Sequence, residues 1–353
     1  MPPRRRKRID PAAFSLPVEQ IKQGFYTDTY FVRAREIVRA DKKSPNVLMQ
    51  FTGKTGGWVA GVDEAIALLK LCADDWNALA VHALYDGDQY DDWDTVLTIE
   101  GPYESFGHLE TLCLGALGRR TKVCTNAKQL CVAAQPKPVM FFGARDDVLW
   151  SQPGDGYAAM VGGVKLVSTD AQASLFGGKS VGTIPHALIA AFGGDTVKAT
   201  KRFADMFEGV DVIALVDYDN DSVKTSLEVA RALDGRLYGV RLDTAETMVD
   251  KSVVAQMGGF KPTGVNASLV WNVRNALDAE GFGEVKIVVS GGFDLERVQA
   301  FEEDGVPVDA YGIGAALFEG RFDFTADIVQ VNGKPQAKVG RKLRENPRLE
   351  RVK

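Results

Sequence analysis

Residues 211–242 read DVIALVDYDNDSVKTSLEVARALDGRLYGVRL, and the pattern within them indicates an α/β fold. Two short β-like runs, Asp211–Val216 and Leu237–Leu242, flank a stretch with apolar residues at helical spacing, Ser222–Leu233. A strand, a helix and a second strand in this order form a βαβ unit with parallel strands. Because parallel strands are buried on both faces, the almost continuously apolar run Val212–Val216 fits this interpretation.

The same alternation continues on both sides of this unit. Altogether seven strand candidates lie between residues 139 and 313, which predicts an irregular seven-stranded, TIM-like βα barrel; a doubly wound sheet is the alternative. The dinucleotide-binding fingerprint of doubly wound sheets is missing, because Gly312-Ile313-Gly314 lacks the third glycine. The other predicted strands are Val139–Gly143, Lys165–Thr169, Ser180–Ile184, Val285–Val289 and Val308–Ile313, and the other predicted helices are Ala187–Phe192, Val197–Phe207, Val265–Asp278 and Leu295–Glu303.

The composition is that of a soluble globular protein. Of the 353 residues, 45% are hydrophobic and 25% are charged, which provides a core and argues against disorder. The apolar runs are far shorter than the ~20 residues of a membrane span, and no apolar segment follows the basic N-terminus, so we expect neither a membrane segment nor a secretory signal. The net charge of −5 argues against nucleic acid as the main partner. The four cysteines, Cys72, Cys113, Cys124 and Cys131, form no C-x-x-C pair, so we expect reduced thiols and a cytoplasmic location. No histidine lies at ligand spacing from them, so we expect no zinc.

The chain changes character near residue 135, at the proline-containing linker Gln135–Pro138. Before it, strand signals at Asn46–Thr52 and Thr95–Glu100 accompany helical spacing at Asp63–Cys72 and Leu109–Leu117. The predicted organisation is a basic tail and lead-in at 1–23, an α/β N-terminal domain at 24–135 and the barrel at 136–320. The basic run Arg4–Arg8 and the stretch Lys338–Lys353 are predicted to be solvated tails.

Polar residues follow the predicted barrel strands, at the edge where βα barrels place their active sites. They come from all seven strand ends, so chance is a poor explanation of their placement. We call this set the strand-end rim; in chain order it consists of Arg145; Ser168, Thr169 and Asp170; Thr183 and His186; Asp217, Asp219 and Asp221; Arg241 and Asp243; Ser290, Gly291 and Gly292; and Gly312 and Gly314.

The residue types of the rim predict a phosphate-bearing ligand. The glycine-rich turns at 290–292 and 312–314 can bind phosphate through backbone N–H groups; the alternative is that they only form tight turns. Arg145 and Arg241 can hold further anionic oxygens, or each can be a surface ion-pair partner.

A metal ion and a reactive imidazole are further candidates at the rim. Asp217 and Asp243 can hold Mg²⁺ through carboxylate oxygens, directly or through water. Of the three histidines, His82, His108 and His186, only His186 belongs to the rim. A functional role and a structural role are both open for it from its position alone.

Short motifs along the chain resemble the nicotinate phosphoribosyltransferase family. Gly182–Ile189 reads GTIPHALI and is similar to the family's G-T-x-P-H-A-L-I segment, and Tyr26–Tyr30 reads YTDTY and resembles its T-D-x-Y motif. The matches cover about residues 24–342. The others, in the family's order, are Glu110-Thr111 through Thr125-Asn126, Phe142–Arg145, Val240–Asp243, Ser290–Gly292, Tyr311–Gly314, Asp323–Val329 and Lys338–Arg341.

The resemblance implies the type II phosphoribosyltransferase fold, with residues 321–353 returning to the N-terminal domain. It implies a homodimer in which Asp28 and Tyr30 complete the active site of the neighbouring subunit. It also implies the reaction of nicotinate with phosphoribosyl pyrophosphate, assisted by ATP and Mg²⁺, which gives nicotinate mononucleotide and pyrophosphate for NAD biosynthesis. ATP would phosphorylate His186 transiently.

The rim residues fit this chemistry. The pyridine nitrogen has a free lone pair, so the site needs positioning and charge neutralisation rather than a strong base. Phe142 can stack on the ring or belong to the core. The resemblance places Ser168 at the pyridine 3-substituent, which favours nicotinate; a two-residue slip would place Asp170 there and favour nicotinamide. Bound substrate would contact Phe142, Arg145, Ser168, Thr183, Arg241 and Asp243, with its phosphate on Ser290, Gly291, Gly292, Gly312 and Gly314.

Two other functions remain open from the sequence. Quinolinate phosphoribosyltransferase would use the same scaffold, although the motif at His186 argues against it. The second is a barrel that binds nucleotides for regulation without catalysis.

Overall fold

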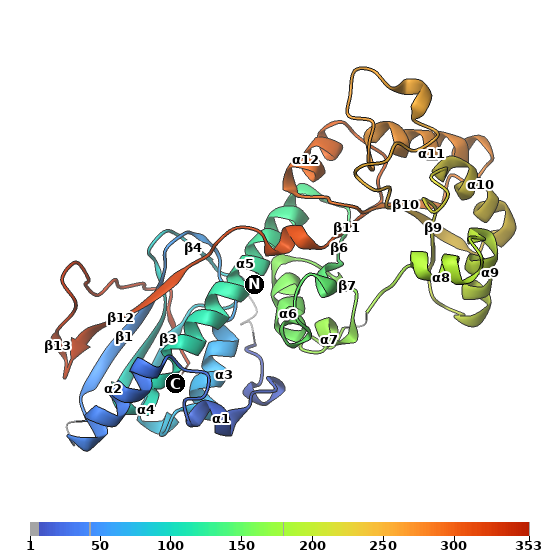
Figure 1. The fold of residues 1–353 in the computed structure, drawn as a ribbon. Coiled ribbons are helices and arrows are strands. Elements are labelled where there is room, and N and C mark those ends of the chain that lie inside the picture. The colour runs from blue at the N-terminus through green and yellow to red at the C-terminus, as the bar shows by residue number, and fades with distance from the viewer. Residues whose placement is uncertain (1–6, 42–43, 179, 353) are drawn as a thin grey trace, which may run out of the picture.

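The computed structural model describes residues 7–41, 44–178 and 180–352, and it contains two six-stranded sheets with a long helix running between them (Figure 1). The predicted α/β class is confirmed. The helix, α5 (Glu110–Ala133), buries Cys113 and Leu117 in the core of the first sheet and Cys124 and Leu130 in the core of the second. It is much longer than the helix predicted at Leu109–Leu117. The prediction stopped early because charged residues interrupt the apolar pattern of the helix after Leu117.

The first sheet is antiparallel and uses strands from both ends of the chain. Its order is β13 (Lys334–Pro335), β12 (Phe324–Val331), β1 (Asn46–Gly53), β5 (Thr95–Pro102), β3 (Ala80–Ala83) and β14 (Glu350–Arg351). Strands β2 (Gly57–Trp58) and β4 (Gln89–Tyr90) form a separate pair.

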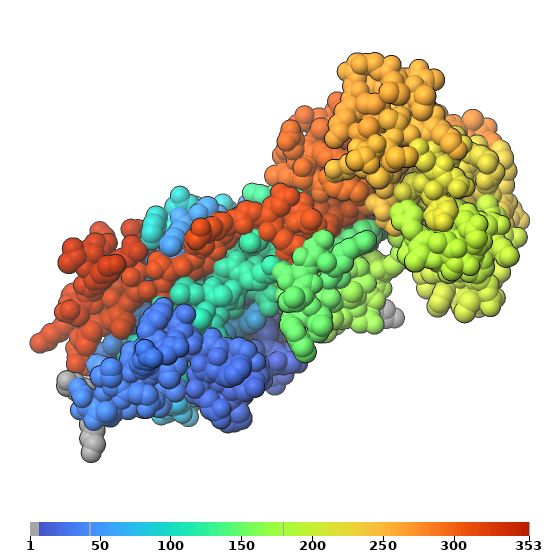
Figure 2. Space-filling view, viewed as in Figure 1, coloured from blue at the N-terminus to red at the C-terminus, as the bar shows by residue number. Residues whose placement is uncertain are grey.

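The C-terminal stretch lies along the first sheet, where Figure 2 shows its red surface beside the blue and cyan N-terminal segments. Most described residues of Lys338–Lys353 are exposed, as the prediction of a solvated stretch requires, but the stretch is not a free tail. Its backbone has specific partners: the Gln50 amide bonds Lys342 O and Arg344 N, both at 2.9 Å, and the Thr95 hydroxyl donates to Arg344 O at 2.6 Å. These partners are distant in sequence, so the run of basic residues alone could not predict that the stretch packs on the first sheet.

The basic run at the N-terminus is only partly described. Arg4–Arg6 lie outside the described residues, whereas Arg8 donates to Asp63 at 2.9 Å and stacks on the Tyr85 ring at 4.0 Å. The prediction of a solvated tail is therefore wrong for Arg8.

The second sheet is a parallel half-barrel. Its order is β7 (Leu166–Val167), β6 (Val139–Phe141), β11 (Ala310–Ile313), β10 (Lys286–Val289), β9 (Leu237–Leu242) and β8 (Val212–Leu215). The strand predicted at Ser180–Ile184 forms one isolated bridge, between Ser180 and Val167, and one backbone bond from Ile184 N to Ile213 O at 3.3 Å. A nearby proline, Pro185, has no N–H with which to continue a ladder.

Most helices of the second sheet start at a capping side chain. Asp195, Asp221, Asn266 and Asp294 each accept a hydrogen bond from the backbone N–H three residues on, which stabilises the first turn. The helices of this part are α6 (Gln152–Gly162), α7 (Asp170–Ala173), α8 (His186–Ala191), α9 (Thr196–Met206), α10 (Ser222–Leu233), α11 (Ala267–Ala279) and α12 (Leu295–Glu303). Those of the first part, besides α5, are α1 (Val18–Lys22), α2 (Thr29–Ala40), α3 (Val62–Cys72) and α4 (Tyr103–Phe106).

No helix in residues 7–41, 44–178 and 180–352 is both long enough and apolar enough to cross a membrane.

His108 makes folding stability depend on pH. It is fully buried. Burial, reinforced by the Arg35 cation, lowers its pKa to about 4. Between about pH 6.5 and this value the unfolded chain binds a proton that the folded chain does not, so stability falls as the pH falls.

The free energy of unfolding of the native protein should fall when the pH is lowered from 7 to 4.5. In His108→Phe we expect this fall to be smaller by about 2–3 kcal/mol. Urea unfolding at the two pH values measures this difference. His82→Phe, on strand β3, is the matched control. An equal change in both variants would contradict the role of His108.

Candidate active site

Arg241, Asp243 and Ser290 form one hydrogen-bonded cluster at the carboxyl ends of β9 and β10. The Nη1 atom of Arg241 lies 3.0 Å from Ser290 Oγ and 3.0 Å from Asp243 Oδ2, and Ser290 Oγ donates to Asp243 Oδ1 at 2.8 Å. Arg241 is only 7% exposed, and its Nε has no partner among the described residues. A buried guanidinium donor without an acceptor is costly, which makes the Arg241 side chain a candidate for binding an anionic ligand.

Phe142 packs on a small apolar cluster formed by the strands of the half-barrel, near Arg241. It packs on Met140, Ile213, Val288 and Ala310, and its ring centroid lies 6.0 Å from Cζ of Arg241. A β-carbon at position 312 would lie 2.4 Å from Phe142 Cε2, so only glycine allows the ring this place.

The turn after β10 leaves backbone donors free. Gly291 and Gly292 have φ values of +82° and +73°, which side-chain-bearing residues rarely adopt. Arg297 Nη1 donates to their carbonyl oxygens at 2.9 and 2.7 Å, whereas their N–H groups find no acceptor among the described residues. Sequence reasoning missed Arg297; its place in the first turn of the helix after the glycines was the available signal.

His186 pairs with Asp217 across the neighbouring strand ends. Its Nε2 lies 3.2 and 3.1 Å from the two carboxylate oxygens; the His186 side chain is 47% exposed and that of Asp217 is 7% exposed. Burial raises the pKa of Asp217, the imidazole opposes this, and the Asp243 charge adds to it. The sequence predicted both residues at the rim but gave no sign of their pairing.

Ser168 and Asp170 face different partners. The Ser168 hydroxyl donates to Gln172 Oε1 at 3.1 Å, and the Asp170 carboxylate accepts from Ser180 at 2.6 Å. Arg145 is exposed at the end of a 3₁₀ turn after β6, and Thr183 is half-buried in the segment before α8.

Asp28 and Tyr30 are not brought to the rim of their own chain. They lie at the start of α2, at the opposite end of the molecule from β9 (Figure 1). Tyr30 is 62% exposed, and Thr111 donates to Asp28 at 2.8 Å. Burial and the carboxylates of Asp327 and Asp28 raise the pKa of Glu110 to about 7, so this face gathers several acids; sequence reasoning missed Glu110 as a site residue.

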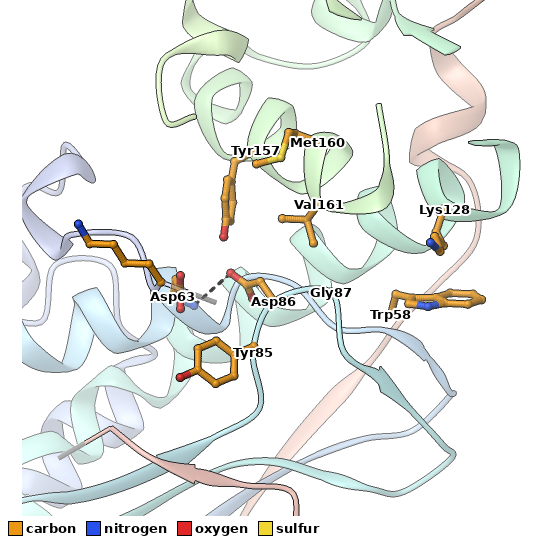
Figure 3. Close-up of a pocket in the computed structure, with 10 residues that line it drawn as sticks. Trp58, Asp63, Tyr85, Asp86, Gly87, Lys128, Tyr157, Met160 and Val161 are labelled. Atoms are coloured by element: carbon orange, nitrogen blue, oxygen red, sulfur yellow. Dashed lines mark hydrogen bonds between the residues drawn. The ribbon is translucent and has the colours of Figure 1, made fainter. Parts of the chain in front are cut away.

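A cavity of about 310 Å³ lies away from the rim, between the first sheet and α6 (Figure 3). None of the predicted site residues lines it. Asp63, Asp86, Tyr85 and Tyr157 are among its walls. Asp86 accepts the N–H groups of Val62 and Asp63 at 2.8 and 3.3 Å, which caps α3 and is a structural role.

Two carboxylates, those of Asp217 and Asp243, are the rim side chains that could bind a metal ion together. Among the residues that the structure describes, no group of three or more His, Cys, Asp or Glu side chains has the arrangement of a metal site. Asp217 and Asp243 are close enough for their charges to interact. Two carboxylates suit Mg²⁺, which keeps waters and takes its other ligands from substrate phosphates.

Comparison with known proteins adds independent information. Residues 28–121 match the family described as Quinolinate phosphoribosyl transferase, N-terminal domain. A nicotinate phosphoribosyltransferase of Mycobacterium tuberculosis is 28% identical over 262 residues, which are 72% of this chain and 54% of that protein. One of Arabidopsis thaliana is 23% identical and 56% covered, so the chain spans about half the length of the curated relatives it matches.

Solved structures share the fold at greater coverage of both chains. Human nicotinic acid phosphoribosyltransferase shares the fold, with a TM-score of 0.70 at 19% identity over 88% of this chain and 75% of that one. The nicotinate-nucleotide pyrophosphorylase of Pyrococcus furiosus is 36% identical, with a TM-score of 0.80 over 94% of this chain and 81% of that one. With this identity over most of both chains, and with the curated relatives above, the chain belongs to the nicotinate phosphoribosyltransferase family and its type II phosphoribosyltransferase fold.

Proposed function

We propose that the protein transfers phosphoribosyl from phosphoribosyl pyrophosphate to nicotinate, giving nicotinate mononucleotide and pyrophosphate for NAD biosynthesis. The observation that carries this proposal is the cluster of Arg241, Asp243 and Ser290 near Phe142, in which one guanidinium donor has no partner among the described residues. The family relationship gives the reaction class.

The residues of the rim would act by positioning and charge neutralisation. Phe142 stacks on the pyridine ring, and Arg241 holds an anionic oxygen in a site with little water. The free N–H groups of Gly291 and Gly292 bind the ribose phosphate, together with Ser290, Gly312 and Gly314. When bound, Mg²⁺ on Asp217 and Asp243 would neutralise the departing pyrophosphate.

Nicotinate is the preferred pyridine in this proposal. Ser168 places a neutral side chain at the strand end, with its hydroxyl donated to Gln172 Oε1, whereas the Asp170 carboxylate accepts from Ser180. A negative charge at the ring substituent would repel a carboxylate and favour an amide. Quinolinate is the second candidate, because residues 28–121 match a quinolinate phosphoribosyltransferase domain.

The wider organisation is part of the same proposal. Segment 180–184 would complete a seven-stranded barrel at 136–320, with the lead-in at 1–23 and the N-terminal domain at 24–135 joined by 321–353. A homodimer would bring Asp28 and Tyr30 to the partner's rim. Exposed apolar residues support such an interface on both parts: Phe25, Tyr30 and Ile37 on one, and Val148, Leu149 and Trp150 on the other. The four unpaired cysteines support a cytoplasmic location.

A pyrophosphate-release assay tests the function. The purified protein is given phosphoribosyl pyrophosphate with nicotinate, nicotinamide or quinolinate, each with and without ATP. Release with nicotinate above the other two supports the proposal. Equal or better use of nicotinamide would overturn the role of Ser168, and sole use of quinolinate would overturn the function.

ATP is expected to phosphorylate His186 transiently. Asp217 faces Nε2, so an Nε2–H donor leaves the lone pair on Nδ1 for attack at the γ-phosphorus of ATP, with ADP as the leaving group. Incubation with γ-labelled ATP should give acid-labile, alkali-stable label on the native protein and none on His186→Asn. Label that persists in this variant, or ATP stimulation that survives it, would contradict the coupling role.

A further inference from the structure

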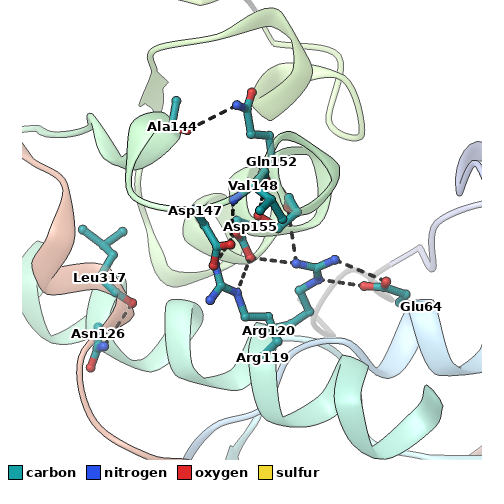
Figure 4. Close-up of polar contacts among 11 residues, drawn as sticks. Glu64, Arg119, Arg120, Asn126, Ala144, Asp147, Val148, Gln152, Asp155 and Leu317 are labelled. Carbon is teal, nitrogen blue, oxygen red and sulfur yellow. Dashed lines mark hydrogen bonds and ion pairs between the residues drawn. The ribbon is translucent and has the colours of Figure 1, made fainter. Parts of the chain in front are cut away.

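Gln152 connects the two loops that carry Arg145 and Ser168. As the first residue of α6, it donates from Nε2 to Ala144 O at 3.3 Å, a contact drawn in Figure 4. Its Oε1 accepts from the Thr169 hydroxyl at 3.0 Å. Ala144 directly precedes Arg145, and Thr169 directly follows Ser168. One amide therefore spans the gap between the two loops.

The connection continues to Ser168 through a second glutamine. The Gln172 side chain is buried, and its Oε1 accepts from Ser168 N and Oγ, each at 3.1 Å, and from Thr169 N at 3.2 Å. The Thr169 hydroxyl in turn accepts from Gln172 N at 3.1 Å. Hydrogen bonds thus run without interruption from Ala144 to Ser168.

Ion pairs fix the helix turn that bears Gln152. Asp155, 2% exposed, accepts from Arg119 Nη2 and from Arg120 Nη1, both at 2.7 Å. Arg119 also reaches Asp147 of the first loop at 2.5 Å, and Arg120 reaches Glu64 of α3 at 2.8 Å (Figure 4). Because several partners over-determine this turn, Gln152 presents its amide from a rigid base.

We propose that Gln152 is a positioning residue that sets the separation of Arg145 and Ser168 and thereby the preference for the ring substituent. The inference rests on the proposed function and adds to it that these two residues flank the 3-substituent of the pyridine ring. A carboxylate needs donors at a fixed spacing, whereas an amide needs a donor and an acceptor. A loosened spacing would therefore weaken nicotinate binding more than nicotinamide binding.

Gln152→Met removes both hydrogen bonds at nearly constant side-chain volume. We expect it to raise the KM for nicotinate about tenfold, with little change in the KM for phosphoribosyl pyrophosphate, and to lower the nicotinate-to-nicotinamide preference. Gln299→Met, on the exposed face of α12, is the matched control. Combined with Thr169→Val, the loss should be less than additive, since both changes break the same bond. An unchanged KM for nicotinate, or an equal loss toward both substrates, would overturn the proposal.

Amide hydrogen exchange provides a readout that needs no turnover. In Gln152→Met, exchange over residues 166–173 should become faster, while exchange over 295–303 stays unchanged. If the native protein releases pyrophosphate with none of the three pyridines, the proposed function fails. The exchange measurement still tests whether Gln152 holds the loop of Ser168 in place. Faster exchange in Gln152→Met supports this role, and unchanged exchange overturns it.

Discussion

Replacing Arg241 by alanine is expected to lower kcat/KM for nicotinate about 30- to 1000-fold. This corresponds to the loss of about 2–4 kcal/mol of transition-state stabilisation, as for a charged hydrogen bond in a site with little water. The guanidinium donates to Ser290 and faces Asp243, and its buried Nε has no partner among the described residues. The fold should survive, because Arg241 lies at a strand end and contributes little to the apolar core. Steady-state kinetics and a thermal melt measure the two quantities.

Two variants control this experiment. Arg236→Ala removes a half-exposed arginine that pairs with Asp205 on the surface, so its activity should stay near that of the native protein. Arg241→Lys keeps the charge but not the fork of donors, so it should fall between the other two. A fully active Arg241→Ala protein would remove this residue from the site.

Mixing two inactive variants is expected to restore activity. Tyr30→Ala and Arg241→Ala damage different parts of the proposed shared site, and Tyr30 is exposed at the far end of its own chain from β9 (Figure 1). After random exchange of subunits, half of the dimers are hybrids with one intact site, which gives about a quarter of the native activity. Pyrophosphate release before and after mixing measures the recovery.

The matched control is a mixture of Arg241→Ala with the double variant Tyr30→Ala/Arg241→Ala, which contains no intact site in any pairing. Two affinity tags show whether subunits exchange. Absence of recovery despite exchange would mean that Tyr30 does not act in the neighbouring subunit's site.

The parallel sheet and its helices could be predicted because their signals are local. Ser222–Leu233 and Leu295–Glu303 have the predicted bounds, since each follows an aspartate that caps its first turn. Parallel strands place their carboxyl ends at one edge, so the meeting of Arg241 and Ser290 also follows from the order of elements.

Other features depend on contacts that local pattern does not contain. Helix α5 continues through Arg119 and Arg120 because acids from α3 and α6 neutralise them, and those acids are distant in sequence. Helix α6 starts in the glycine-rich segment QPGDG, which propensity alone excludes. The pairing of His186 with Asp217 and the lack of a described partner for Arg241 Nε depend on side-chain geometry, which the rim prediction did not contain.

The position of β1 between β12 and β5 has a consequence for synthesis of the chain. Val47, Met49 and Phe51 of β1 are buried in the finished sheet. One of the two strands that pair with β1 is Phe324–Val331, which is synthesised near the end of the chain. On the ribosome, β1 waits as an open edge while the whole half-barrel is translated, on the order of tens of seconds. Open edges can pair with strands of other chains, so the nascent N-terminal part is exposed to aggregation during this interval. The first segment of the sheet to be made is thus among the last to be completed.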